Sequence, residues 1–194
     1  ININNKINIS VPSGNFGNIC AGLIAMKMGL NVNNFIAATN INDTIPRYLK
    51  TGNYRPKKTI RTISNAMDVS DPNNFPRIEH IFDNNFQALK NKIHAEKVNE
   101  EETKNQIKKT YYNSKYILDP HGAVGLVGLS RYNLKNEIGI FLETAHPIKF
   151  RDSITEILNV NIDDPLKLTN ESDNHKIALK NNYSDLIEFI KQSQ

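Results

Sequence analysis

Residues 10–18 read SVPSGNFGN, and this glycine-rich stretch separates two apolar segments of different periodicity. In residues 7–11 apolar and polar side chains alternate, which predicts a strand. Residues 19–28 are apolar and compatible with a helix, and Gly29 is a suitable stop. Residues 35–39 form a second apolar run, predicted to be a buried strand. Strand, loop, helix and strand in this order predict a βαβ unit with a right-handed crossover.

The rest of the chain continues this alternation. Helices are predicted at residues 44–50, 73–93, 99–112 and 183–190, with a small-residue helix after residue 119 and an amphipathic segment at residues 150–158. Strands are predicted at residues 59–63, 116–118 and 138–142. This alternation favours an α/β fold with a mostly parallel sheet flanked by helices.

The composition is that of an ordinary globular protein. The 194 residues are 39% apolar and 23% charged, with a formal net charge of +4. Basic residues are scattered among acidic ones, so we expect no nucleic-acid partner. The single cysteine, Cys20, excludes an internal disulfide and fits a reducing compartment. No apolar stretch approaches the ~20 residues of a membrane span and no signal peptide is visible, so we expect a cytoplasmic protein without membrane contacts.

The glycine-rich loop has the composition of an anion site. We expect Gly14 and Gly17 to adopt positive φ and to let the backbone approach a ligand closely. Asn18 is the predicted N-cap of the following helix, whose free N–H groups favour a dianion. Ser13 and Asn15 add side-chain donors. The patterns G-x-x-x-x-G-K-S/T and G-x-G-x-x-G are absent, which disfavours ATP, GTP and dinucleotides. A plain βα turn without a ligand is the alternative interpretation.

Three further stretches have polar or small residues at predicted strand or helix ends. FLETAHPIKF, residues 141–150, places Thr144 at the carboxyl end of a buried strand, where open α/β sheets bind ligands. A helix cap before Pro147 is the alternative. The other two stretches are ILDPHGAVGL and TISNAMDVSDPNNF. Together with the loop, these motifs resemble, in order and spacing, the threonine synthases, which are pyridoxal-phosphate enzymes of fold type II. The resemblance covers nearly all 194 residues as the C-terminal portion of that family.

The resemblance implies a cofactor site and a reaction. In the family, the loop that matches Gly14, Asn15, Phe16, Gly17 and Asn18 cradles the phosphate of pyridoxal 5′-phosphate, and we add the Ser13 hydroxyl to this cradle. The threonine that matches Thr144 hydrogen-bonds the pyridine nitrogen of the cofactor. The implied reaction converts O-phospho-L-homoserine and water to L-threonine and phosphate.

The resemblance also implies that one catalytic group lies outside this sequence. The Schiff-base lysine of the family belongs to its N-terminal portion, in a Ser-Phe-Lys-Asp-like motif that does not occur here. The sequence begins with Ile1, just before a predicted strand, and we expect it to be a fragment. We therefore expect no catalytic residue in residues 1–194, no activity of the chain alone, and a partner in the N-terminal portion of the same protein.

Substrate contacts are predicted at two places. Asn40, Asn42, Asp43 and Arg47 follow a predicted strand and are candidates for the substrate mouth, with a capped helix start as the alternative. His121 is a candidate proton carrier or substrate contact, with a helix-entry residue as the alternative. The five histidines lack ligand spacing, so no metal is expected.

Two other functions stay open. One is another fold-type II lyase, such as a threonine dehydratase, which also has a glycine-rich phosphate loop. The other is a non-catalytic module that binds a phosphate ligand or nucleic acid, for which the pI of 9.0 leaves room.

Overall fold

The computed structural model describes residues 6–162 and 177–192. The chain divides into two units, residues 1–162 and residues 163–194. In the second unit the described structure is the helix α8, Tyr183–Gln192, which agrees with the predicted terminal helix. The candidate site lies entirely in the first unit. None of the helices in the described parts of the chain is long and apolar enough to cross a membrane.

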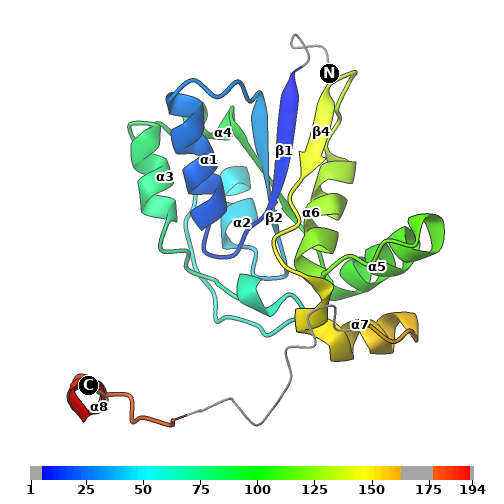
Figure 1. Ribbon diagram of the computed structural model, residues 1–194. Coiled ribbons are helices and arrows are strands. Elements are labelled where there is room, and N and C mark those ends of the chain that lie inside the picture. The colour runs from blue at the N-terminus through cyan, green and yellow to red at the C-terminus, as the bar shows by residue number, and fades with distance from the viewer. Residues whose placement is uncertain (1–5, 163–176, 193–194) are drawn as a thin grey trace. The chain divides into compact units, whose positions relative to one another are not determined.

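The first unit is built on a four-stranded parallel sheet (Figure 1). Its strands are β1 Ile7–Pro12, β2 Asn34–Thr39, β3 Ile93–Lys97 and β4 Ile138–Phe141, in the order β3-β2-β1-β4. Val11 of β1 pairs with Ala37 of β2, and Ile9 pairs with Ile140 of β4. The sheet confirms the predicted α/β fold, and β1, α1 Gly17–Lys27 and β2 are the predicted βαβ unit.

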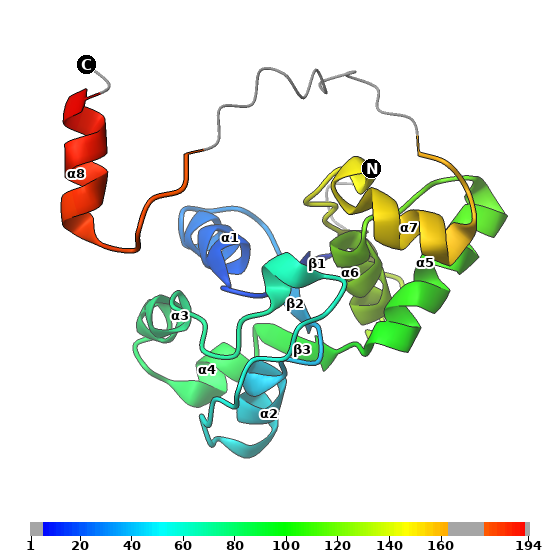
Figure 2. The same cartoon turned by 90° about the horizontal axis from the view of Figure 1, so that it is seen from below.

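Helices cover both faces of the sheet, as the view from below shows (Figure 2). On one face lie α1, α2 Thr44–Thr51, α3 Phe75–Ile81 and α4 Phe86–Lys90. On the other lies α6 Pro120–Arg131, with α5 Glu100–Ser114 and α7 Arg151–Leu158 beside it. Two 3-10 turns, η1 Asn65–Met67 and η2 Pro147–Phe150, lie at the carboxyl end of the strands. Helix α5 begins with a capping box, because Asn99 and Glu102 exchange side-chain to backbone hydrogen bonds of 2.9 and 2.8 Å.

Helix α6 packs closely against the sheet through its glycines. A Cβ atom on Gly128 would be 2.7 Å from the Cβ atom of Ala38 in β2. The hydroxyl of Ser10 in β1 donates a hydrogen bond of 2.7 Å to the carbonyl oxygen of Gly125. This contact fixes the start of α6 at the carboxyl end of the strands, where Asp119 and His121 lie.

Three predicted elements are wrong, and each has a physical reason. Residues 59–63 form no strand, because side chains rather than a neighbouring strand accept from their N–H groups. Residues 116–118 are irregular, and Leu118 is buried against α5 and α7 instead. The single helix predicted at residues 73–93 is interrupted at Asp83 and Asn84, which have φ of 53° and 57°. The chain then forms α4 and enters β3 at Ile93, a strand that the periodicity did not indicate.

Candidate functional site

The glycine-rich loop joins β1 to α1, but its backbone differs from the prediction. Gly14 and Gly17 do not have positive φ, so that expectation is wrong. The left-handed residue is Phe16, with φ 60° and ψ 18°, and it is also the N-cap in place of Asn18. A non-glycine residue in this conformation is uncommon and persists only where the surrounding structure holds it.

Packing of the Phe16 ring holds the loop in this shape. The side chain is only 3% exposed, and its ring meets the ring of Phe75 edge-on, with centroids 5.8 Å apart. Asn73 and Asn74, just before α3, add two hydrogen bonds to Asn15, through its side-chain and main-chain oxygens, of 2.7 and 2.8 Å. With Phe16 as the N-cap, the first N–H groups of α1 have no partner within the helix. They are therefore available to an anion.

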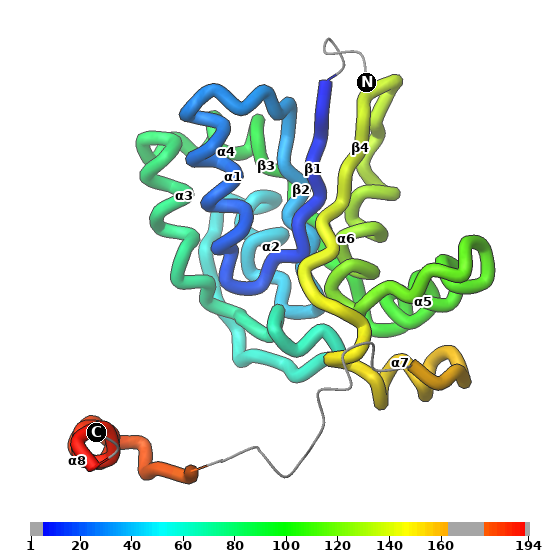
Figure 3. The backbone as a smooth tube through the Cα atoms, viewed as in Figure 1, coloured from blue at the N-terminus to red at the C-terminus, as the bar shows by residue number. Residues whose placement is uncertain are grey.

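One cavity brings together the predicted cofactor residues. Its volume is about 290 Å³. The residues that line it are Pro12, Ser13, Gly14, Asn15, Phe16, Gly17, Asn18, Ala66, Met67, His121 and Thr144. The loop after β1 and the segment after β4 leave the sheet at the same end, as the backbone trace shows (Figure 3). Four segments that are distant in sequence meet at this cavity. None of its lining residues is a lysine or arginine.

Individual polar groups of the cavity differ in their availability. The Ser13 hydroxyl donates to the carbonyl oxygen of Val11 at 2.8 Å, so its hydrogen is already used. Asn18 and Thr144 are exposed, and no side-chain hydrogen bond is recorded for either among the described residues. Thr144 follows β4 by three residues, at the predicted strand end.

The backbone of Ala66 and Met67 forms a wall of the cavity that the sequence analysis missed as part of the site. A hydrogen-bonded cluster fixes this wall. One Asp68 carboxylate oxygen accepts from Asn40 Nδ2 at 2.9 Å and from the Thr62 hydroxyl at 2.8 Å. The other accepts from the Thr62 N–H group at 3.0 Å. Asp68 therefore ties residues 62–68 to the end of β2. The SNAMDV motif was the available signal for this segment.

Asn42 extends the same cluster. Its side-chain oxygen accepts from the Ile60 N–H group at 2.8 Å and from the Ser70 hydroxyl at 3.1 Å, while its amide nitrogen donates to the carbonyl oxygen of Ile60 at 2.9 Å. Asn40 and Asn42 are 3% and 7% exposed and do not line the cavity at the glycine-rich loop. In this structure their side chains position residues 60–70, and a contact with substrate stays a prediction.

Replacing Asp68 by asparagine tests this cluster. An amide nitrogen facing the Thr62 N–H group would leave two donors opposed, and we expect a loss of about 1–3 kcal/mol in the free energy of unfolding. The control is Asp71→Asn, because the Asp71 carboxylate accepts one exposed hydrogen bond, from the Tyr54 hydroxyl at 2.6 Å, that an amide oxygen can also accept. Urea unfolding of the two variants gives the comparison. Equal losses would contradict a special role for Asp68.

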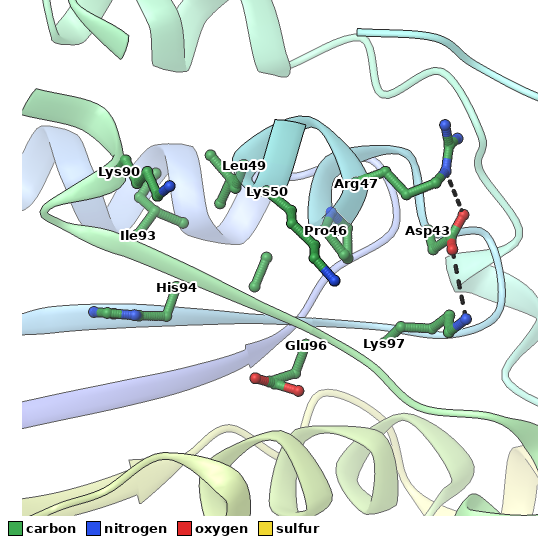
Figure 4. Close-up of a pocket in the computed structure, with 11 residues that line it drawn as sticks. Asp43, Pro46, Arg47, Leu49, Lys50, Lys90, Ile93, His94, Glu96 and Lys97 are labelled. Atoms are coloured by element: carbon green, nitrogen blue, oxygen red, sulfur yellow. Dashed lines mark hydrogen bonds and ion pairs between the residues drawn. The ribbon is translucent and has the colours of Figure 1, made fainter. Parts of the chain in front are cut away.

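Asp43 and Arg47 lie at a different cavity, of about 660 Å³, beside β3. Figure 4 shows Arg47 and Lys97 reaching the Asp43 carboxylate from two directions, at 2.8 and 3.6 Å. Burial alone would raise the pKa of Asp43, but the hydrogen bond and charge of Arg47, with the charge of Lys97, hold it below the usual value. The structure therefore places Asp43 and Arg47 in an ion-pair cluster, away from the cavity formed by the glycine-rich loop and Thr144. Their contact with substrate stays a prediction.

A buried carboxylate and a histidine form the remaining part of the site. His121 Nδ1 lies 2.7 Å from Asp119 Oδ1, and the side chains are 4% and 0% exposed. Asp119 also accepts from the His121 and Gly122 N–H groups at 2.8 and 3.3 Å, which caps α6. Its own N–H group donates to Glu143 Oε1 at 3.0 Å. The residue before Thr144 is thereby tied to the start of α6. Among the described residues, no group of three or more potential ligands is arranged to hold a metal ion.

The Glu143 carboxyl group should make stability depend on pH. Burial raises the pKa of Glu143 from 4.5 to about 7, and the Asp119 carboxylate adds to the rise. The folded protein therefore keeps this proton where the unfolded chain loses it, so the contribution of Glu143 to stability is complete below pH 4.5 and is lost as the pH rises to about 7. We expect Glu143→Gln to exceed the unaltered protein in stability at pH 8 by about 1 kcal/mol after solvent screening. Urea unfolding at pH 4.5 and pH 8 measures the difference in free energy of unfolding between Glu143→Gln and the unaltered protein. A difference of equal size at both pH values would contradict this prediction.

Comparison with known proteins agrees with the geometry. Residues 2–140 match the family described as "Pyridoxal-phosphate dependent enzyme". The threonine synthase of Buchnera aphidicola subsp. Baizongia pistaciae is 48% identical over 163 residues, which are 84% of this chain and 37% of that protein.

Solved structures give the same result. The crystal structure of threonine synthase from Escherichia coli superposes with a TM-score of 0.85 and 41% identity, covering 98% of this chain and 44% of that one. The structure of PLP-bound threonine synthase from Brucella melitensis superposes with a TM-score of 0.79 and 28% identity, covering 86% and 41%. The chain thus spans less than half the length of these relatives.

Proposed function

Because this chain belongs to the pyridoxal-phosphate-dependent enzyme family and matches its threonine synthase members, we propose that it is the C-terminal part of a threonine synthase. The complete enzyme would convert O-phospho-L-homoserine and water to L-threonine and phosphate. The observation that carries this proposal is the cavity formed by the loop after β1, the η1 backbone, His121 and Thr144. It adds a physical reason to the similarity, because these residues suit one anionic, aromatic ligand.

The donors at this cavity fit pyridoxal phosphate. The loop Gly14–Asn18 presents backbone N–H groups at the start of α1, which suits a phosphate without any basic side chain. Thr144 has an uncommitted hydroxyl in the same cavity, which suits the pyridine nitrogen. His121 Nε2 is buried without a hydrogen-bond partner in the described parts of the chain, as expected of an atom that a ligand satisfies. When bound, the cofactor supplies an electron sink for the amino-acid substrate.

The residues of this chain would therefore bind and orient rather than form a covalent bond. The loop would anchor the phosphate, and the neutral Thr144 hydroxyl would leave the pyridine nitrogen largely unprotonated, whereas a carboxylate would keep it protonated. The lysine that holds the cofactor covalently is proposed to come from the N-terminal portion of the same protein. Asn40, Asn42, Asp43, Arg47 and His121 are the proposed substrate contacts, of which His121 lines the cavity.

Substitutions at Thr144 test its proposed contact. In the protein that contains this chain and its N-terminal portion, Thr144→Ser keeps the hydroxyl and should change turnover little. Thr144→Val keeps the shape but removes a hydrogen bond of about 1.5 kcal/mol, equivalent to about tenfold in rate. Thr144→Asp should protonate the ring nitrogen and change the absorption spectrum of the bound cofactor. If the serine, valine and aspartate variants behave alike, Thr144 does not contact the cofactor, since the cap of η2 is His146 and not Thr144.

The function itself is tested by turnover of three substrates. The protein with its N-terminal portion should release phosphate and threonine from O-phospho-L-homoserine, and should not deaminate threonine or serine. Deamination without phosphate release would favour a dehydratase.

The chain of 194 residues alone should be inactive. After incubation with pyridoxal phosphate and borohydride, its lysines should carry only scattered, substoichiometric label. Stoichiometric labelling of one lysine would contradict the proposed division of the active site.

A further inference from the structure

His121 is the one ionisable side chain among the residues that line the cofactor cavity. The cavity contains no lysine or arginine, although the proposed ligand carries a phosphate dianion. Backbone N–H groups at a helix start supply partial positive charge only. An anion beside a histidine stabilises the protonated imidazole, because opposite charges at short range favour the charged form. Among the lining residues, His121 is therefore the side chain whose protonation can place a full positive charge beside the ligand.

Asp119 fixes the orientation of the imidazole. The carboxylate lies 2.7 Å from Nδ1, and its side chain is completely buried. Burial alone would raise the pKa of Asp119, but hydrogen bonds from His121 and Gly122 hold it below its usual value. Asp119 is therefore an ionised acceptor, and Nδ1 carries a hydrogen that it donates to Asp119. The ring of Phe150, with its centroid 5.0 Å away, restricts the imidazole further.

The other ring nitrogen, Nε2, lacks a hydrogen-bond partner within residues 6–162 and 177–192. His121 is 3% exposed, and its Nε2 atom makes no hydrogen bond to any described residue. The Asp119 carboxylate contacts this ring at Nδ1, and the Glu143 carboxyl group lies next to Asp119, from whose N–H group it accepts a hydrogen bond. Burial raises the pKa of Glu143 to about 7, so its carboxyl group is largely neutral in mildly acidic solution. The ring thus has a fixed anion on one side and an unsatisfied nitrogen on the other.

We infer that His121 binds as an imidazolium and that its Nε2–H group donates a hydrogen bond to an anionic oxygen of the ligand in this cavity. Asp119 is the positioning residue that stabilises the imidazolium from behind. The anionic oxygen belongs to a phosphoryl, phenolate or carboxylate group, supplied by the cofactor or by the amino-acid substrate. This inference rests on the proposed function and adds a proton-linked anion contact to it. Ligand binding should therefore raise the pKa of His121, and ligand affinity should fall as the pH rises through that pKa.

The direct test is an NMR titration of ¹⁵N-labelled histidines in the protein with its N-terminal portion. Resonances of His121 are followed from pH 5 to 9 without ligand, with pyridoxal phosphate, with pyridoxal, and with pyridoxal phosphate plus L-threonine. We expect the pKa of His121 to rise by about one unit or more, equivalent to a tenfold preference of the ligand for the imidazolium. The exposed His80 of α3 is the internal control, and its titration curve should be the same with and without ligand.

The arms of the experiment separate the sources of the anion. If the pKa of His121 rises with pyridoxal phosphate but not with pyridoxal, the contact is with the phosphate. If this pKa rises with both, the contact is with another oxygen of the cofactor. If it rises only after L-threonine is added, the contact is with the amino-acid carboxylate. An unchanged or lowered pKa with both ligands bound overturns the inference and leaves the proposed function intact. Absence of cofactor binding, read from the absorption spectrum of the same sample, overturns the proposed function and this inference with it.

Two variants give an independent measurement. His121→Gln keeps a donor near the Nε2 position but does not titrate, so the pH dependence of pyridoxal phosphate affinity should shrink to that of the ligand alone. Asp119→Asn keeps an oxygen that caps α6 but removes the charge behind the ring. It should bring the pKa of His121 in the bound protein back toward that of the ligand-free protein. A pH dependence that is identical in the unaltered protein and in His121→Gln would also overturn the inference.

Discussion

Replacing Gly14 by alanine should abolish tight binding of pyridoxal phosphate and lower the free energy of unfolding by about 2–3 kcal/mol. A Cβ atom on Gly14 would lie 2.6 Å from Met67 Cα and 2.9 Å from the carbonyl oxygen of Ala66. Both contacts are with backbone, which cannot move aside as the end of a side chain can. The Ser13 N–H group holds the loop to Ala38 of β2 at 2.8 Å, and the Asp68 cluster holds the opposing segment. Relief of the clash would therefore separate the loop from the cavity wall.

Gly17→Ala is the matched control for this prediction. Its added Cβ atom would meet only the Asn74 side-chain nitrogen, at 3.6 Å, and the φ of Gly17 is not positive. Alanine also favours a helix, and Gly17 is the first residue of α1. We expect stability within about 0.5 kcal/mol of the unaltered protein and a small change in cofactor affinity. Urea unfolding and titration with pyridoxal phosphate compare the two variants. Similar losses in both would mean that the crowding at Gly14 does not shape the site.

The contrast between these glycines shows where sequence reasoning succeeded and where it failed. Two adjacent local signals, a strand and then a glycine-rich helix start, were sufficient to predict the loop. Which glycine is required, and for what reason, depends on a segment more than fifty residues away that closes on Gly14. The positive φ was assigned to glycines because they tolerate it, whereas tertiary packing of the ring imposes it on Phe16.

Thr144 and His121 were predictable for a different reason. Thr144 follows strand β4, and parallel strands bring such points to one edge of the sheet, whereas the strand predicted before His121 does not form and His121 reaches the cavity as the second residue of α6. The residues that support the site left weaker signals. Asp68 and Glu143 act through backbone and side-chain partners that become neighbours only in the folded chain. Strand β3 was missed because residues 73–93 were predicted as one helix up to its first residue, and the break in that helix depends on two residues in the left-handed conformation.

Replacing Phe16 by alanine should destabilise the protein by about 3–5 kcal/mol, the usual cost of truncating a buried phenylalanine. The ring is 3% exposed and packs within the main core cluster, which also contains Ile19, Leu23 and Phe75. Its removal leaves a cavity directly behind the loop and removes the support of its left-handed backbone. Cofactor affinity should fall together with stability, because the N–H groups of Phe16 and Gly17 lose their orientation. Urea unfolding and cofactor titration measure the two effects.

A glycine at the same position separates backbone strain from the loss of the ring. Phe16→Gly removes the same aromatic contacts as Phe16→Ala and leaves a slightly larger cavity, which by itself should make it the less stable variant. The left-handed conformation, however, costs a residue with a Cβ atom about 1–2 kcal/mol and costs glycine little. We therefore expect the glycine variant to equal or exceed the alanine variant in stability by up to about 1 kcal/mol, and to retain more cofactor affinity. An alanine variant that is clearly the more stable would show that the φ of 60° at Phe16 stores no strain, and that the ring alone shapes the loop.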